Sequence, residues 1–164
     1  MLVVDTSAFV SLAVGGVLDI VVNEFEVVTT ETVRSELRET AGYDDRHGDA
    51  AGQALELTDA VDVLAGTDGI ERVVTSRIDE GEASCVVAAR ETDAEFLITD
   101  DYRALPELRA AVGSRVALSP IVLRVLVKRD ALDEGEARTA FEAISEGRDW
   151  LEAPIHRYAR ELFE

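Results

Sequence analysis

The sequence has only one cysteine, Cys85, and one lysine, Lys128, among 164 residues. A single cysteine cannot form a disulfide within the chain, and it provides none of the ligand spacings of a zinc site. Because Cys85 lies in the apolar run CVVAA, we expect a small buried side chain. No apolar run reaches the about 18 residues of a membrane span, and the start, MLVVDTS, has no basic segment. These absences favour a cytoplasmic protein without a disulfide, a zinc centre or a membrane partner.

Basic residues are scarce relative to acidic ones. Asp and Glu number 34 against 16 Lys and Arg, so the net charge is −18. An acidic surface almost without lysine suggests adaptation to high salt, because at about 1 M salt the Debye length is only about 3 Å. We therefore expect a halophilic source. The acidic balance is then no evidence of a basic partner, and most single carboxylates are expected to be solvated surface groups.

The length and composition indicate one globular domain over residues 1–164. The apolar content of 47% and the charged content of 30% suit a packed core and argue against a disordered chain. The sequence shows no internal repeat, linker or low-complexity segment. We expect a core over about residues 1–118 and a helical extension over about 119–164.

Short apolar segments alternate with helical ones along the chain. Strands are expected at 2–5, 26–29, 96–99 and 115–119, with ambiguous strands at 61–65 and 71–76. Helices are expected at 7–13, 17–23, 30–40 with Thr30 as cap, 50–57, 80–91 and 105–112, with a polar loop at 41–49. The extension predicts helices at 120–128, 133–146 and 154–163, in which Ala137, Ala140, Phe141 and Ile144 share one face. This alternation predicts an α/β fold with a mainly parallel sheet flanked by helices.

Acidic residues end two of the apolar segments abruptly. Asp5 follows LVV, and Asp100 and Asp101 follow FLIT. Sheets of this kind place their ligands beyond the carboxyl ends of the strands, so these acids are expected to lie close together. Carboxylates that close repel each other unless a proton or a cation lies between them. Oxygen ligands with no histidine or cysteine nearby favour Mg²⁺ or Mn²⁺.

Two acids on predicted helices are further candidates. Glu36 lies next to the buried side of its helix, and Glu82 lies on the apolar face of a helix at its first turn. Each acid also has a simple structural explanation. Asp5 could cap the helix that follows, Asp100 or Asp101 could form an Asx turn, Glu36 could be a surface group, and Glu82 could be a favourable charge at a helix N-terminus.

Four segments in order, LVVDTSAFV, ETVRSEL, DEGEASCVVAA and FLITDDYRAL, resemble the PIN domain. PIN domains include toxin-type and RNA-processing ribonucleases with a Rossmann-like sheet. The resemblance covers about residues 1–118, and DTS and TDD are its more specific parts. The tail from Ser119 resembles the extension of a PilT-like subgroup with a GEA motif.

The resemblance implies a set of site residues. Asp5, Glu36, Glu82 and Asp101 correspond to the four catalytic acids, with Asp100 as an additional metal ligand. Ser7 and Thr99 correspond to residues that support the site. Asp79 or Glu80, which are close to Glu82, could take its place.

The function implied by the resemblance is an Mg²⁺- or Mn²⁺-dependent endoribonuclease, in which the metal activates a water for attack on a phosphodiester. An overall negative charge repels RNA, so nearby arginines are expected to contact it: Arg34, Arg38, Arg77 and Arg103. The family also suggests a toxin with an antitoxin partner, and a homodimer. The apolar residues Phe9, Val10, Leu12 and Leu18 could form the dimer surface or belong to the core.

Other functions remain open at this stage. A haloacid-type phosphatase needs a second Asp where Ser7 stands, and a response-regulator receiver needs a lysine late in the sheet, whereas Lys128 follows the last predicted strand. An inactive PIN-like binding module and a halophilic protein without an active site are the non-enzymatic alternatives.

Overall fold

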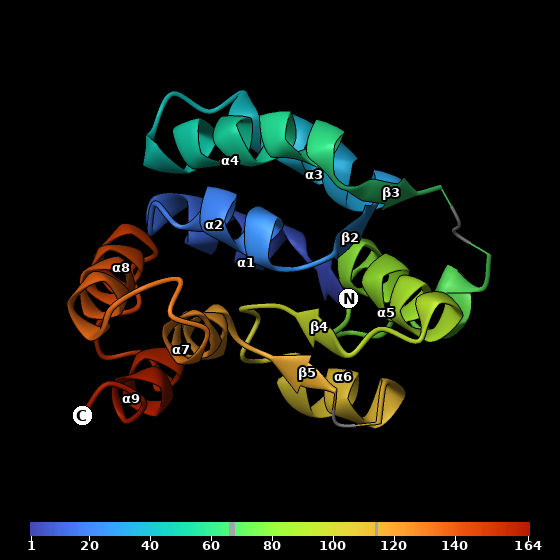
Figure 1. The fold of residues 1–164 in the computed structure, drawn as a ribbon. Helices are drawn as coiled ribbons and strands as arrows, with labels where there is room; N and C mark the ends of the chain where they lie inside the picture. Colours follow the sequence, from blue (N-terminus) through green and yellow to red (C-terminus); the bar gives the residue numbers. More distant parts are fainter. Residues whose placement is uncertain (66–67, 114) are drawn as a thin grey trace.

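The protein is built around a five-stranded sheet, which the computed structural model describes together with the rest of residues 1–65, 68–113 and 115–164 (Figure 1). The strand order is β3-β2-β1-β4-β5, and every neighbouring pair is parallel. Helices flank this sheet. The expected α/β fold with a parallel sheet is therefore confirmed.

The elements follow the alternation that the sequence predicts. The strands are β1 (Leu2–Val4), β2 (Val27–Thr30), β3 (Asp62–Leu64), β4 (Phe96–Ile98) and β5 (Val116–Ala117). The helices are α1 (Thr6–Val14), α2 (Leu18–Glu24), α3 (Glu31–Ala41), α4 (Arg46–Leu57), α5 (Glu80–Thr92), α6 (Leu105–Ala111), α7 (Ser119–Lys128), α8 (Glu134–Gly147) and α9 (Pro154–Arg160), with 3₁₀ turns at Thr58–Ala60 and Ile70–Arg72.

The central strands β1 and β4 determine where a ligand can bind. All three residues of β1 are buried, as expected for a strand covered on both faces. Val4 pairs with Ile98, so Asp5 and Thr99 leave the sheet side by side. The chain continues from β1 to β2 on one side of the sheet and returns from β3 to β4 on the other side of β1. The β1–β4 boundary is therefore a topological switch point, where such sheets bind ligands.

The C-terminal helices α7, α8 and α9 gather beside α1 and α2 (Figure 1). The predicted apolar face of α8 is confirmed, because Ala137, Ala140, Phe141 and Ile144 are all buried. The ring of Phe141 stacks on that of Phe163 with centroids 4.7 Å apart. The tail is therefore packed onto the body of the protein.

Two predicted helix boundaries and one ambiguous predicted strand are wrong. Helix α4 begins at Arg46 instead of residue 50, because the Asp45 side chain accepts a hydrogen bond from the Gly48 N–H at 2.8 Å and starts the helix inside the expected loop. Residues 71–76 do not form a strand, since the chain there makes a 3₁₀ turn and Val74 is exposed. Helix α9 ends at Arg160, three residues earlier than expected.

The apolar residues of the first two helices belong to the core. Phe9, Val10, Leu12 and Leu18 are buried within the single chain, so they are not available as a dimer surface. In the described ranges no single helix has the length and apolar composition to cross a membrane. The pair α1 and α2 meets that criterion only when joined, with a bend of 117° between them.

Candidate active site

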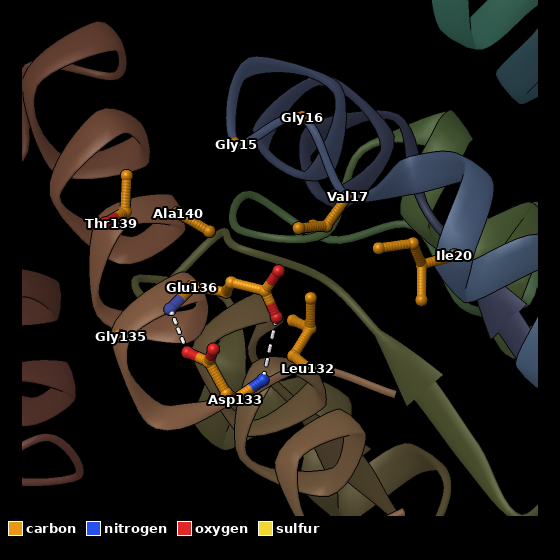
Figure 2. A pocket seen from close by; sticks show the side chains of 10 residues that line it. All are labelled: Gly15, Gly16, Val17, Ile20, Leu132, Asp133, Gly135, Glu136, Thr139 and Ala140. Carbon is orange, nitrogen blue, oxygen red and sulfur yellow. Dashed lines mark hydrogen bonds between the residues drawn. The ribbon is translucent and has the colours of Figure 1, made fainter. Parts of the chain in front are cut away.

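An open cleft of about 380 Å³ lies beyond the carboxyl ends of β1 and β4. Six acids and one basic residue contribute to its lining. They come from the segments that follow β1 and β4, from α3, from the start of α5 and from the residue after α8. The lining residues are Asp5, Thr6, Ser7, Val10, Glu36, Glu39, Thr40, Tyr43, Asp79, Glu82, Asp101 and Arg148. A larger hollow of about 560 Å³ lies elsewhere, where the α1–α2 turn faces the start of α8 (Figure 2). Its acids Asp133 and Glu136 hydrogen-bond to each other's backbone N–H groups as a helix cap.

Asp5 lies at the floor of the cleft and is only 4% exposed. It occupies the position before α1, but its side chain makes no capping hydrogen bond to that helix. The hydroxyls of Ser7 and Thr99 instead donate to the same oxygen, Oδ2, at 2.8 and 3.0 Å. Asp5 is therefore not a side-chain cap of α1. Its carboxylate is instead oriented by Ser7 and Thr99, the two residues expected to support the site.

Glu36 reaches the cleft from α3, where Val33 and Leu37 bury the neighbouring face. Its Oε2 accepts a hydrogen bond from the Thr6 hydroxyl. The Glu36 carboxylate lies directly over Gly81, and a Cβ built on Gly81 would be 2.6 Å from Oε2. The glycine in the GEA segment therefore leaves the space that Glu36 occupies.

Glu82 comes from the first turn of α5 and is almost fully buried. It forms a capping box with Asp79: the Glu82 side chain accepts from the Asp79 N–H at 3.0 Å, and Asp79 accepts from the Glu82 N–H at 2.8 Å. Asp79 also lines the cleft, whereas the exposed Glu80 lines a different hollow beside Thr32. Of the two alternatives to Glu82, only Asp79 is therefore close to the other acids.

The two consecutive acids after β4 point in different directions. Oδ1 of Asp101 accepts the N–H groups of Arg103 and Ala104 at 2.9 and 3.1 Å, which is an Asx turn, and the residue also lines the cleft. Asp100 is buried, and its two oxygens accept from the Ser119 N–H at 2.8 Å and the Ser119 hydroxyl at 2.7 Å. Asp100 therefore stabilises the start of α7 and is not part of the cleft lining.

The four cleft acids that the sequence predicts, Asp5, Glu36, Glu82 and Asp101, share one arrangement. One oxygen of each carboxyl group is fixed by a hydrogen bond from the protein. The second oxygen of Asp5 and of Glu36 receives no side-chain hydrogen bond from the described residues. In that part of the chain no three such groups are already close enough together to hold a metal ion. The acids therefore line an open cleft and do not form a closed ligand set.

Burial and crowding make these carboxyl groups hard to ionise. Burial raises the pKa of Asp5, although the Ser7 and Thr99 hydroxyls oppose the shift. Burial likewise raises the pKa of Glu36 to about 7 and that of Glu82 to about 9, with the charges of Asp5 and Asp79 adding to both shifts. At neutral pH the metal-free cleft holds at least one proton, on Glu82.

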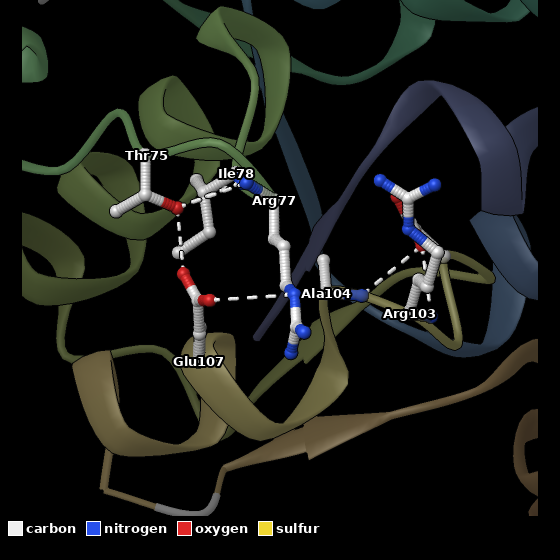
Figure 3. A network of polar contacts seen from close by, with 7 residues as sticks. Thr75, Arg77, Ile78, Arg103, Ala104 and Glu107 are labelled. Carbon is white, nitrogen blue, oxygen red and sulfur yellow. Dashed lines mark hydrogen bonds and ion pairs between the residues drawn. The ribbon is translucent and has the colours of Figure 1, made fainter.

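The four arginines that we expected to contact RNA are not among the residues lining the cleft. Arg34 pairs with Asp59 at 2.8 Å, and Arg38 is exposed near the end of α3. Arg77 contacts Glu107 at 3.9 Å, in a network that Thr75 extends (Figure 3). Figure 3 also shows the side chain of Arg103, which is exposed. Their contact with RNA remains a prediction.

Sequence reasoning missed Arg148, which is the only basic residue among the described residues that line the cleft. It follows α8 directly, at the C-cap position. Burial lowers its pKa, and the charges of Asp100 and Asp5 oppose this shift. No motif marks Arg148 in the sequence, because its position depends on how the tail folds back onto α1.

The parallel sheet and the acids at its switch point define an α/β protein with an acidic cleft at the carboxyl ends of its central strands. The family model DUF3368, described as a PIN domain, matches residues 1–162. The chain therefore belongs to the PIN-domain family, whose members are commonly nucleases that use divalent metals. Searches of curated proteins and of solved structures found no match.

Proposed function

We propose that this protein is an Mg²⁺- or Mn²⁺-dependent endoribonuclease that acts through Asp5, Glu36, Glu82 and Asp101. The observation that carries the proposal is the convergence of these four acids, from four separate segments, on one cleft at the switch point of the sheet. Asp5 and Glu82 are buried, and neither forms an ion pair within the described residues, which is unfavourable for carboxylates that have no ligand to bind.

The chemistry of the cleft suits a hard divalent cation. All candidate ligands are carboxylate oxygens, which is the set that Mg²⁺ and Mn²⁺ prefer. The raised pKa values of Glu36 and Glu82 reflect repulsion and burial that a cation would relieve. Side chains or backbone groups of the protein already fix one oxygen of each acid, as residues around a metal site do when they orient its ligands.

A bound ion would lower the pKa of a water and neutralise charge on the scissile phosphate. The protein's own groups have separate tasks. Ser7 and Thr99 keep Asp5 oriented, Thr6 orients Glu36, and the Asx turn orients Asp101. Burial favours the protonated form of Glu82, and a bound cation would favour its ionised form.

RNA cleavage by purified Asp5→Asn tests the proposal. The amide matches the carboxylate in shape, and its oxygen can still accept both hydroxyls, because Ser7 and Thr99 use one and the same oxygen. We expect the wild type to cleave RNA with added Mn²⁺ and to be inactive in EDTA. Asp5→Asn should be folded and inactive.

The exposed Asp62 on β3 provides the matched control, since Asp62→Asn removes the same charge far from the cleft. Cleavage by Asp5→Asn at the rate of Asp62→Asn would contradict the assignment. Titration of Mn²⁺ by calorimetry separates an active site from an inactive PIN-like binding module, which should show no stoichiometric binding. The RNA that is cleaved, a toxin role and a homodimer remain predictions of the family resemblance.

A further inference from the structure

Arg148 is unusual among the arginines of this protein. It lines the acidic cleft, and its Nε is buried without a hydrogen-bond partner. Among the described residues only Arg34 shares this feature, and the terminal nitrogens of Arg34 are paired with Glu31 and Asp59. Arg148 makes no ion pair with any carboxylate in the described part of the chain. The guanidinium therefore lies at the cleft, and the described residues give it no carboxylate partner and no hydrogen bond to Nε.

The chain around Arg148 is fixed in place. The Gly147 carbonyl accepts a hydrogen bond from Nε2 of His47 at 2.8 Å. A Cβ on Gly147 would lie 2.6 Å from Cγ1 of Val14, so the end of α8 approaches α1 as closely as a glycine allows. Trp150, two residues after Arg148, is buried. Its backbone N–H donates to the Ser145 carbonyl at 2.9 Å. This anchoring presents the arginine from the C-terminal helices in a defined position.

A purely structural role as counterion explains Arg148 poorly. Asp100 is the acid whose charge acts on it most strongly, but Asp100 already accepts two hydrogen bonds from Ser119. Asp5 is likewise held by two hydroxyls. A guanidinium that served these acids would be expected to form a charge-assisted hydrogen bond with one of them, and none is present among the described residues.

The geometry points to Arg148 as the phosphate-binding residue of the cleft, which contacts the RNA backbone beside the four acids. The inference rests on the proposed function and adds a substrate contact to it. A guanidinium has five N–H donors in a planar fork that suits two oxygens of a phosphate. In a protein with a net charge of −18, a cation at this point offsets the repulsion that a phosphodiester would meet from six acids.

The binding of a fluorescent single-stranded RNA oligonucleotide, measured by anisotropy with Ca²⁺ in place of Mn²⁺, tests the proposal without requiring cleavage. Titrations run over the range of salt in which circular dichroism shows the fold to be intact. Arg148→Ala should weaken binding by about tenfold, as expected for the loss of one charge-assisted contact. It should also lower the slope of log Kd against log salt by about 0.7, the value for one phosphate contact on a single strand.

Arg160→Ala is the matched control. It removes the same charge from the same helical tail, but Arg160 is exposed, pairs with Glu164 at 2.9 Å and is not among the residues lining the cleft. The control should keep the affinity and the salt slope of the wild type. If Arg148→Ala does not fold, Arg148→Gln replaces it, with the same expected losses.

The proposal is overturned if the Arg148 variant and Arg160→Ala give the same affinity and slope, even when the Arg148 variant is less stable. That result would leave Arg148 as a structural counterion. If the wild type binds RNA but does not cleave it with Mn²⁺, the proposed nuclease activity is refuted. The comparison of RNA affinities between the Arg148 and Arg160 variants would then still decide the role of Arg148. A wild type that binds no RNA would overturn both proposals.

Discussion

Replacement of Glu82 by Gln should change how stability depends on pH. Burial raises the pKa of Glu82 from an ordinary value of 4.5 to about 9, so the folded protein holds a proton there that the unfolded chain has lost. A folded state that binds more protons becomes less stable as the pH rises. The stabilisation of the folded state by protonated Glu82 is therefore complete below about pH 4.5 and is lost progressively as the pH rises to about 9.

The size of the effect follows from one proton. Each pH unit inside this window lowers the free energy of unfolding by up to about 1.4 kcal/mol. For a domain of this length, that corresponds to a fall in Tm of roughly 3–5 °C per pH unit. Glutamine has the shape of the protonated acid and can still accept the Asp79 N–H of the capping box. Glu82→Gln should therefore remove this part of the slope. The variant should match the wild type below about pH 4.5 and be more stable than it by up to about 2 kcal/mol at pH 6.

Thermal unfolding in EDTA, followed by circular dichroism from pH 6 to pH 9, measures this difference. The curves of the wild type and Glu82→Gln should diverge as the pH rises. Added Mn²⁺ should flatten the wild-type curve, because a cation favours the ionised carboxylate. Parallel Tm curves for the two proteins in EDTA would refute the reasoning from burial and crowding.

Other changes to the cleft have distinct expected results. Gly81→Ala places a methyl group where the Glu36 carboxylate lies, so calorimetry should show at least about tenfold weaker Mn²⁺ binding while the helix content is unchanged. Ser7→Ala removes one of the two hydroxyls on Asp5, and kcat for RNA should fall by about tenfold; an unchanged kcat would mean that Thr99 alone orients the acid. Phe141→Ala should lower the free energy of unfolding by about 3–5 kcal/mol in a urea titration, because this ring is buried and stacks on Phe163 within the tail.

The sequence predicts the acids better than it predicts what surrounds them. Asp5 and Asp101 stand where apolar runs end, a pattern that the parallel sheet turns into proximity. Asp100 looks equivalent in the sequence, but its direction depends on Ser119, which a strand and a helix bring back to it. Asp45, a usual N-cap residue, marks the start of α4, but the polar residues around it give the segment the composition of a loop.

Residues 71–76 show a different limit of prediction from local sequence. Their apolar content resembles that of a strand, but β3, which pairs with β2, ends the sheet on this side, and no described strand lies beyond it. A strand needs a partner for its backbone groups, and local sequence does not reveal whether one exists. Arg148 illustrates the same point for side chains, because only the packing of α8 against α1 brings it to the acids.

The cleft draws on both ends of the described chain, with Asp5 following the first strand and Arg148 following α8. During translation the first acid therefore leaves the ribosome long before the arginine does. A nascent chain that has already formed β1, β2 and β4 still lacks Arg148, the basic side chain among the described residues that line the cleft. The cleft is therefore completed only after α8 has been synthesised. The sheet can fold before the complete set of lining residues is present.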